Sequence, residues 1–294
     1  MSNKKRKPNY KVIVYIVVFI ASLVAAFYYV PKYTFTHRET VYPKTDKVCV
    51  VLMGDSNVAI PHFEGTMEEK IGELTGFEVY NIAMGGTTAA KLDRTNEQDK
   101  LYDRCCLYNL VNLPITGEVE MYLDDHTEIS KVYSEAVERI TTASIIDFNK
   151  VDYVVLTYGT NDYFTGALAD NEEDPYDVYS YGGALRSSIE KLHEHYPNIK
   201  FLITTPTYCY VKDGDRNIPA LGYDCGGGTL RDYMDVCHKL AKEYDYVAVV
   251  DTYNKIDVNE SNYFDYMSDN LHIWAIAQGR WCEVVAKALK NLEE

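Results

Sequence analysis

A carboxylate and an imidazole stand three residues apart near the C-terminus, as Asp269 and His272. Residues at this spacing lie on one face of a helix or turn, so the carboxylate can orient the imidazole. An imidazole held in this way can take the proton of a serine hydroxyl and so create a nucleophile. The other six histidines lack such a setting, and we interpret each as an exposed or packed residue: His37, His62, His126, His193, His195 and His238.

A candidate nucleophile is Ser56, in the motif Gly54-Asp55-Ser56-Asn57. The motif directly follows an apolar, β-branched run at 48–53, so the serine would lie on the turn after a buried strand. Taken alone, Gly-Asp-Ser is also ordinary turn chemistry, in which Ser56 or Asn57 would only cap a helix. The surrounding elements therefore decide between catalysis and capping.

Two more motifs follow predicted strands. Gly85-Gly86 comes after the run at 77–83, and paired glycines let backbone N–H groups approach a ligand closely, although a plain loop has the same composition. Asn161 comes after the run at 151–158 and brings a side-chain amide that can donate a hydrogen bond. Both motifs are candidates for contacts with a substrate.

Short apolar runs alternate with segments of helical periodicity over most of the chain. We expect five buried strands at 48–53, 77–83, 151–158, 200–205 and 246–250. Helical spacing occupies 66–74, parts of 99–148, 182–196, 229–244 and 275–292. This alternation predicts a three-layer α/β/α fold with a five-stranded parallel sheet, in which ligands bind beyond the carboxyl ends of the strands.

In this order and at these strand ends, the four motifs resemble those of the SGNH hydrolase superfamily, also called GDSL-type esterases and lipases, over about 48–292. The resemblance implies a flavodoxin-like fold. It also implies that Ser56 is the nucleophile, that His272 is the general base, and that Asp269 orients the base.

The resemblance further implies an oxyanion hole formed by the backbone N–H of Ser56, by Gly86 and by Asn161. Gly86 rather than Gly85 matches the family glycine, because it lies five residues after Asn81. The reaction would pass through an acyl-enzyme, which either water or a second alcohol would then attack.

The sequence departs from the family pattern after His272. Family members usually continue with Pro-Asn and reach a glycine about five residues on, whereas here Ile273 and Trp274 follow and Gly279 lies seven residues on. The departure predicts a local turn that differs from that of the family. Trp274 either lines the site or packs beneath it, and we favour packing.

Two segments are long for this fold, at 91–150 and 206–228, and we expect both to shape the pocket. The second contains Tyr208, Tyr210 and Tyr223 beside the strand ends. It is interpreted either as a mobile lid or as a decorated surface loop.

The uncharged run of 19 residues at 12–30 is long enough to cross a bilayer once, at about 1.5 Å per residue. Basic residues gather before it, which predicts a cytoplasmic segment at 1–11, a signal anchor at 12–30, a stalk at 31–47 and an extracytoplasmic domain at 48–294. The competing interpretation is a secretory signal cleaved within 21–26. Either interpretation exports the domain.

The net charge of −15 makes nucleic-acid binding improbable, because the surface would repel phosphates. The seven cysteines are an odd number, and we expect a disulfide between Cys209 and Cys225, which flank a polar loop. Their spacing does not indicate a metal site, and we expect neither a metal nor a cofactor.

The main functional hypothesis is an extracytoplasmic esterase that removes short acyl groups, such as acetyl, from glycans. The alternatives are an O-acyltransferase and a lipase-like acylhydrolase at the membrane surface. The substrate would accordingly be an acylated small molecule, glycan or lipid. A third hypothesis is a surface binding module that has kept the fold without catalysis.

Overall fold

The computed structural model describes residues 42–92, 103–123 and 136–294. The predicted cytoplasmic segment 1–11, the anchor 12–30 and most of the stalk 31–47 therefore lie outside the described residues. Within the described ranges, no helix is both long and apolar enough to cross a bilayer.

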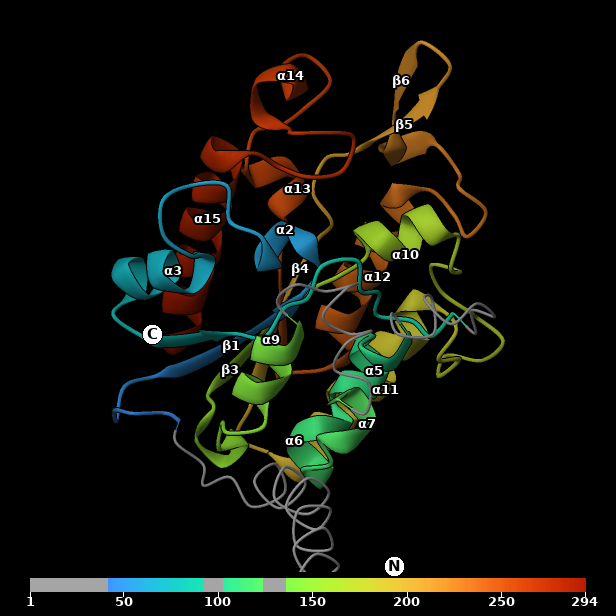
Figure 1. The fold of residues 1–294 in the computed structure, drawn as a ribbon. Coiled ribbons are helices and arrows are strands. Elements are labelled where there is room, and N and C mark those ends of the chain that lie inside the picture. The colour runs from blue at the N-terminus through green and yellow to red at the C-terminus, as the bar shows by residue number, and fades with distance from the viewer. Residues whose placement is uncertain (1–41, 93–102, 124–135) are drawn as a thin grey trace, which may run out of the picture.

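A five-stranded parallel sheet forms the centre of the domain, in the order β2-β1-β3-β4-β7 (Figure 1). The strands are β1 Cys49–Gly54, β2 Glu78–Asn81, β3 Tyr153–Thr157, β4 Lys200–Thr204 and β7 Val247–Val250. Each predicted run coincides with one strand apart from a few residues at its ends, so the predicted sheet is confirmed. Every residue of β1 and β3 is buried, because both faces of these central strands are covered.

Helices pack on both faces of the sheet (Figure 1). The four longest among the described residues are α3 Met67–Thr75, α11 Tyr181–His195, α12 Leu230–Glu243 and α15 Ala275–Glu293. Alternate side chains of β1 point into two cores: Val51 and Met53 lie in the core with α11 and α12, whereas Val50 and Leu52 lie in the core with α3 and α15. The predicted three-layer fold is therefore confirmed.

Short helices fill the connections between these elements. They are α2 Ser56–Ala59, α5 Leu107–Leu110, α6 Asn112–Thr116, α7 Glu120–Leu123, α9 Ala136–Ala143, α10 Thr160–Thr165, α13 Thr252–Lys255 and α14 Tyr263–Tyr266. Single 3-10 turns lie at Phe148–Lys150 and Ala220–Gly222.

The segment 206–228 contains a hairpin, β5 Tyr210–Asp213 with β6 Arg216–Pro219, which the sequence pattern does not predict. Its base is buried, with Tyr208 and Tyr210 only 2% and 8% exposed, whereas its tip at 212–217 is exposed. The N–H of Tyr210 donates to the carbonyl of Asn270 at 3.0 Å. The base is therefore a packed part of the domain that joins onto the Asp269–His272 segment.

All seven cysteines lie in the described residues and are unpaired, so the predicted disulfide between Cys209 and Cys225 is wrong. Cys209 is fully buried at the base of the hairpin, where burial raises the pKa of its thiol. Cys225 lies in a partly exposed turn before α12. The two cysteines flank the hairpin, but each keeps a free thiol.

The guanidinium of Arg186, 3% exposed, bonds the carboxylates of Asp170 and Glu243 at 2.8 and 2.9 Å. We expect Arg186→Ala to lower the free energy of unfolding by about 3–5 kcal/mol, because two partly buried carboxylates lose this cation. Denaturant unfolding followed by circular dichroism measures the loss. The matched control is Arg216→Ala, which breaks an exposed pair with Asp213 and should cost less than about 1 kcal/mol. Equal losses would contradict the account.

Candidate active site

The turn after β1 lies where the chain changes direction across the sheet. From β1 the chain enters β2 on one side and then β3 on the other, and such a reversal leaves a crevice beyond the carboxyl ends of the strands. Ser56 follows this turn as the first residue of α2 and is 6% exposed. The cap of α2 is Asp55, whose carboxylate accepts the N–H of Asn57 at 2.9 Å. Asp55 therefore caps the helix, and Ser56 is not its capping residue.

Ser56, His272 and Asp269 form one hydrogen-bonded line. Ser56 Oγ lies 2.7 Å from His272 Nε2, and His272 Nδ1 lies 2.6 Å from Asp269 Oδ2. With Asp269 ionised, Nδ1 carries the ring proton and donates to the carboxylate, which leaves Nε2 to accept from the serine hydroxyl. This is the tautomer that a general base toward serine requires. The structure thus brings the three predicted residues together.

Hydrogen bonds favour the ionised form of Asp269. Partial burial alone would raise its pKa, but the His272 ring and the backbone N–H groups of Leu271 and His272 all donate to the carboxylate, the latter two at 2.9 and 2.8 Å. Together these bonds lower the pKa of Asp269 below its ordinary value. The carboxylate therefore stays charged at neutral pH, where it can stabilise the imidazolium that forms when His272 takes a proton.

The glycine loop after β2 and the loop after β3 are bonded to each other. Asn161 Nδ2 donates to the carbonyl of Thr87 at 2.9 Å, and the carboxylate of Asp162 accepts the N–H groups of residues 89–90 at 3.0 and 2.9 Å. Gly86 has a φ of +76°, a left-handed conformation that glycine adopts readily. The two predicted oxyanion-hole positions therefore lie on two loops that are joined at the carboxyl edge of the sheet.

Two buried carboxylates, Asp55 in the turn after β1 and Asp162 between the two loops, support the site at a cost in stability. Burial raises the pKa of Asp55 and of Asp162 to about 6 in each case, against hydrogen bonds that lower it. An acid whose pKa is raised by folding destabilises the fold increasingly between its unfolded pKa, about 4, and its folded pKa, and fully at higher pH. The site therefore lowers the stability of the domain at neutral pH. Within the described residues, no three His, Cys, Asp or Glu side chains gather to hold a metal ion.

Asn57 links the nucleophile turn to the histidine segment. Its Oδ1 accepts the N–H of Ile273 at 3.1 Å, and its Nδ2 donates to the carbonyl of Leu271 at 3.3 Å. These backbone groups flank His272, so one buried side chain holds the histidine from both sides. A proline at position 273 would have no backbone N–H, so Asn57 Oδ1 would lose this hydrogen bond. Sequence reasoning misses this role, because Asn57 looks only like a capping residue.

The prediction that Trp274 packs beneath the site is wrong, because its side chain is 46% exposed. In the extended segment after His272, successive side chains point to opposite sides. Ile273, 1% exposed, takes the inward position and leaves Trp274 outside. The indole stacks on the ring of His62, with centroids 4.7 Å apart and ring planes at 24°.

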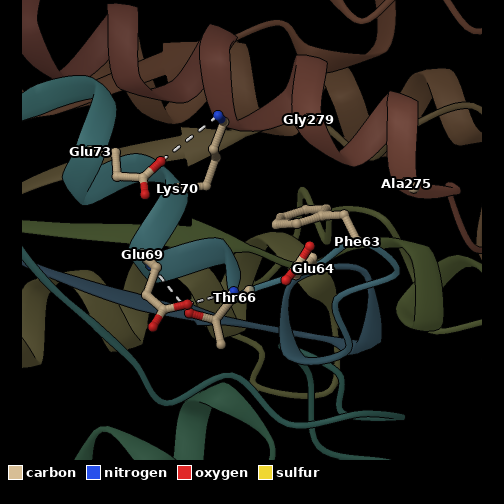
Figure 2. Close-up of a pocket in the computed structure, with 9 residues that line it drawn as sticks. Phe63, Glu64, Thr66, Glu69, Lys70, Glu73, Ala275 and Gly279 are labelled. Carbon is tan, nitrogen blue, oxygen red and sulfur yellow. Dashed lines mark hydrogen bonds and ion pairs between the residues drawn. The ribbon is translucent and has the colours of Figure 1, made fainter.

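A pocket of about 290 Å³ adjoins this ring pair, between α3 and the start of α15 (Figure 2). Phe63, which follows His62, and Ala275, which follows Trp274, both line it. The other lining residues are Glu64, Gly65, Thr66, Glu69, Lys70, Glu73 and Gly279. None of the three residues of the hydrogen-bonded line is among them, so the pocket is separate from this line.

Residues 52–276 match the model of the GDSL-like Lipase/Acylhydrolase family. The chain belongs to this family. The match extends from β1 past His272, and it confirms the superfamily that the motifs predict. No curated protein matches the sequence.

Several solved structures match this chain over nearly their whole length. One solved structure has 19% sequence identity and a TM-score of 0.60. The match covers 84% of this chain and 98% of the chain in that structure. A protein from Lactobacillus plantarum has 13% identity and a TM-score of 0.53, with 87% and 99% covered. A possible lipase from Chitinophaga pinensis has 14% identity and a TM-score of 0.51, with 84% and 99% covered. At these identities the likeness shows the fold alone.

We expect Asn57→Ala to lower kcat for a p-nitrophenyl ester by about 10- to 100-fold, because the backbone loses the bonds at Leu271 and Ile273 that hold His272 between them. The variant should also lose about 1–3 kcal/mol of stability, since the buried N–H of Ile273 is left without a partner. Steady-state kinetics below the unfolding transition separates the two effects.

The control for this variant is Asn109→Ala, which removes an amide that donates to the carbonyl of Asp103 at 2.6 Å, outside the hydrogen-bonded line. Its kcat should stay within about twofold of the parent. If Asn57→Ala keeps the parent kcat, Asn57 does not position the histidine.

Proposed function

We propose that this protein is a serine-dependent esterase of the extracytoplasmic space that removes short acyl groups, such as acetyl, from glycans. The proposal rests on the continuous hydrogen-bonded line from Ser56 through His272 to Asp269. A family of acylhydrolases supplies the reaction class, and this line supplies residues for each proton transfer.

In the proposed reaction, His272 Nε2 takes the proton of Ser56 as Oγ attacks the ester carbonyl carbon. The carbonyl oxygen becomes an oxyanion, and Asp269 stabilises the imidazolium. His272 then gives the proton to the leaving alcohol as the ester C–O bond breaks, which leaves an acyl-enzyme on Ser56. A water molecule gives its proton to His272 and attacks the acyl carbon, and the same steps in reverse release the acid and free Ser56.

Donors for the oxyanion would come from the backbone N–H of Ser56, the N–H of Gly86 and the amide of Asn161. The Asn161 amide has two N–H bonds, and one of them suffices for the carbonyl of Thr87. The second N–H is available for the oxyanion. Each preorganised donor of this kind lowers the barrier by about 3–4 kcal/mol in acyl-transfer enzymes.

Two properties favour hydrolysis of a neutral surface substrate. The side chains of His272 and Asp269 are 26% and 42% exposed, so water can reach the base, which favours hydrolysis over transfer to a second alcohol. The net charge of −15 disfavours anionic lipid headgroups. We further propose that the uncharged run 12–30 anchors the domain outside the membrane, within reach of acylated surface glycans.

We expect Ser56→Ala to lower kcat/KM of the full-length chain on p-nitrophenyl acetate by at least about 1,000-fold, because no other group on the line can form the acyl-enzyme. Ser261→Ala, which changes an exposed serine, should leave the rate unchanged. Retention of hydrolysis in Ser56→Ala would exclude the proposed nucleophile. Rates across p-nitrophenyl esters of increasing acyl length then separate an acetylesterase, which prefers acetate, from a lipase-like enzyme, which prefers long chains.

A further inference from the structure

The exposed stack of Trp274 and His62 is not used by the proposed reaction. Trp274 lies two residues after His272, and side chains two apart in an extended segment point to the same side. The inward Ile273 between them, 1% exposed, fixes this alternation. This alternation predicts that the indole lies on the same side of the segment as the imidazole of the candidate base, and the charges of His272 and Asp269 both act on the pKa of the stacked His62.

The stack is held in place by a buried amide. Gln278, fully buried, accepts the N–H of His62 on its side-chain oxygen at 2.8 Å, and its own N–H donates to the carbonyl of Trp274 at 2.9 Å. Its Nε2 also donates to the carbonyls of Asn57 and Ile60 at 3.2 and 2.9 Å. The Gln278 side chain thus connects the backbone of His62 to the nucleophile turn, and the Gln278 backbone N–H bonds the carbonyl of Trp274. The indole is a fixed flat surface with one face on His62.

The surroundings of the stack combine apolar and hydrogen-bonding groups. Burial and the nearby His272 lower the pKa of His62, so the stacked pair is neutral at neutral pH. In the adjoining pocket, Figure 2 shows the ring of Phe63 next to the carboxylate of Glu64. Carboxylates accept hydrogen bonds from hydroxyl groups and repel phosphates. A flat apolar face beside such acceptors suits a neutral polyhydroxylated ring.

We infer that Trp274, backed by His62, is a specificity-determining residue that binds a pyranose ring of the acylated glycan next to the ester. The apolar C–H face of the sugar stacks on the indole, and its hydroxyls face the polar rim. This inference rests on the proposed glycan esterase function and names the residue that recognises the glycan. An acyl chain is the competing occupant, because Ile60 and Ile276 nearby are also exposed.

The test compares full-length wild type, Trp274→Ala and Trp274→Phe on p-nitrophenyl acetate and on O-acetylated chitotriose. The ratio of kcat/KM for the glycan to that for the nitrophenyl ester should fall at least tenfold in Trp274→Ala, mainly through KM. Trp274→Phe should recover part of the ratio, because a phenyl ring keeps a stacking face. Tyr176→Ala, which removes an exposed aromatic residue that bonds Glu190, should leave the ratio unchanged.

An unchanged ratio in Trp274→Ala, with wild type active on the glycan, would overturn the inference and leave the proposed function standing. A fall in activity on p-nitrophenyl octanoate instead of on the glycan would assign the surface to an acyl chain and also overturn it. If wild type cleaves p-nitrophenyl acetate through Ser56 but does not release acetate from the glycan, the proposed glycan substrate is itself wrong.

Discussion

The two hydrogen bonds of Asn57 are the constraint on which the rest of the site depends. Ser56 belongs to the turn after the first strand of the sheet, whereas His272 lies 216 residues later on an irregular segment. Asn57 bonds the backbone on both sides of that histidine, so the same turn that presents the serine also fixes the imidazole. Their 2.7 Å separation is thus set by a contact of one side chain with the backbone rather than by the sheet alone.

Around this contact, each part of the fold restrains one component of the candidate site. The sheet brings the first three loops to one edge, and Asp162 bonds the glycine loop to the loop after β3. The hairpin base holds Asn270, and Gln278 connects α15 to the nucleophile turn. The buried Asp55 and Asp162 destabilise the domain at neutral pH. The buried carboxylates that preorganise the site therefore lower the stability of the domain.

The sheet, the layers and the family were predictable, because buried parallel strands are continuous apolar runs and the motifs follow them directly. Asp269 and His272 were predictable as a pair, because their spacing alone lets them meet. The hairpin β5–β6 was not predictable from the sequence, because its strands are short and its tip is polar. The role of Asn57 and the outward position of Trp274 depend on long-range contacts and on the inward turn of Ile273. Single residues give no local signal for such contacts.

The most direct test of the central claim is covalent labelling of the folded full-length chain with a fluorophosphonate probe, followed by mass spectrometry of its peptides. We expect one adduct on Ser56 that does not form when the protein is heat-denatured before the probe is added and that forms far more slowly in His272→Ala, because only the assembled line makes the serine nucleophilic. Folded protein without an adduct on Ser56, or with equal labelling when His272 is absent, would contradict the account.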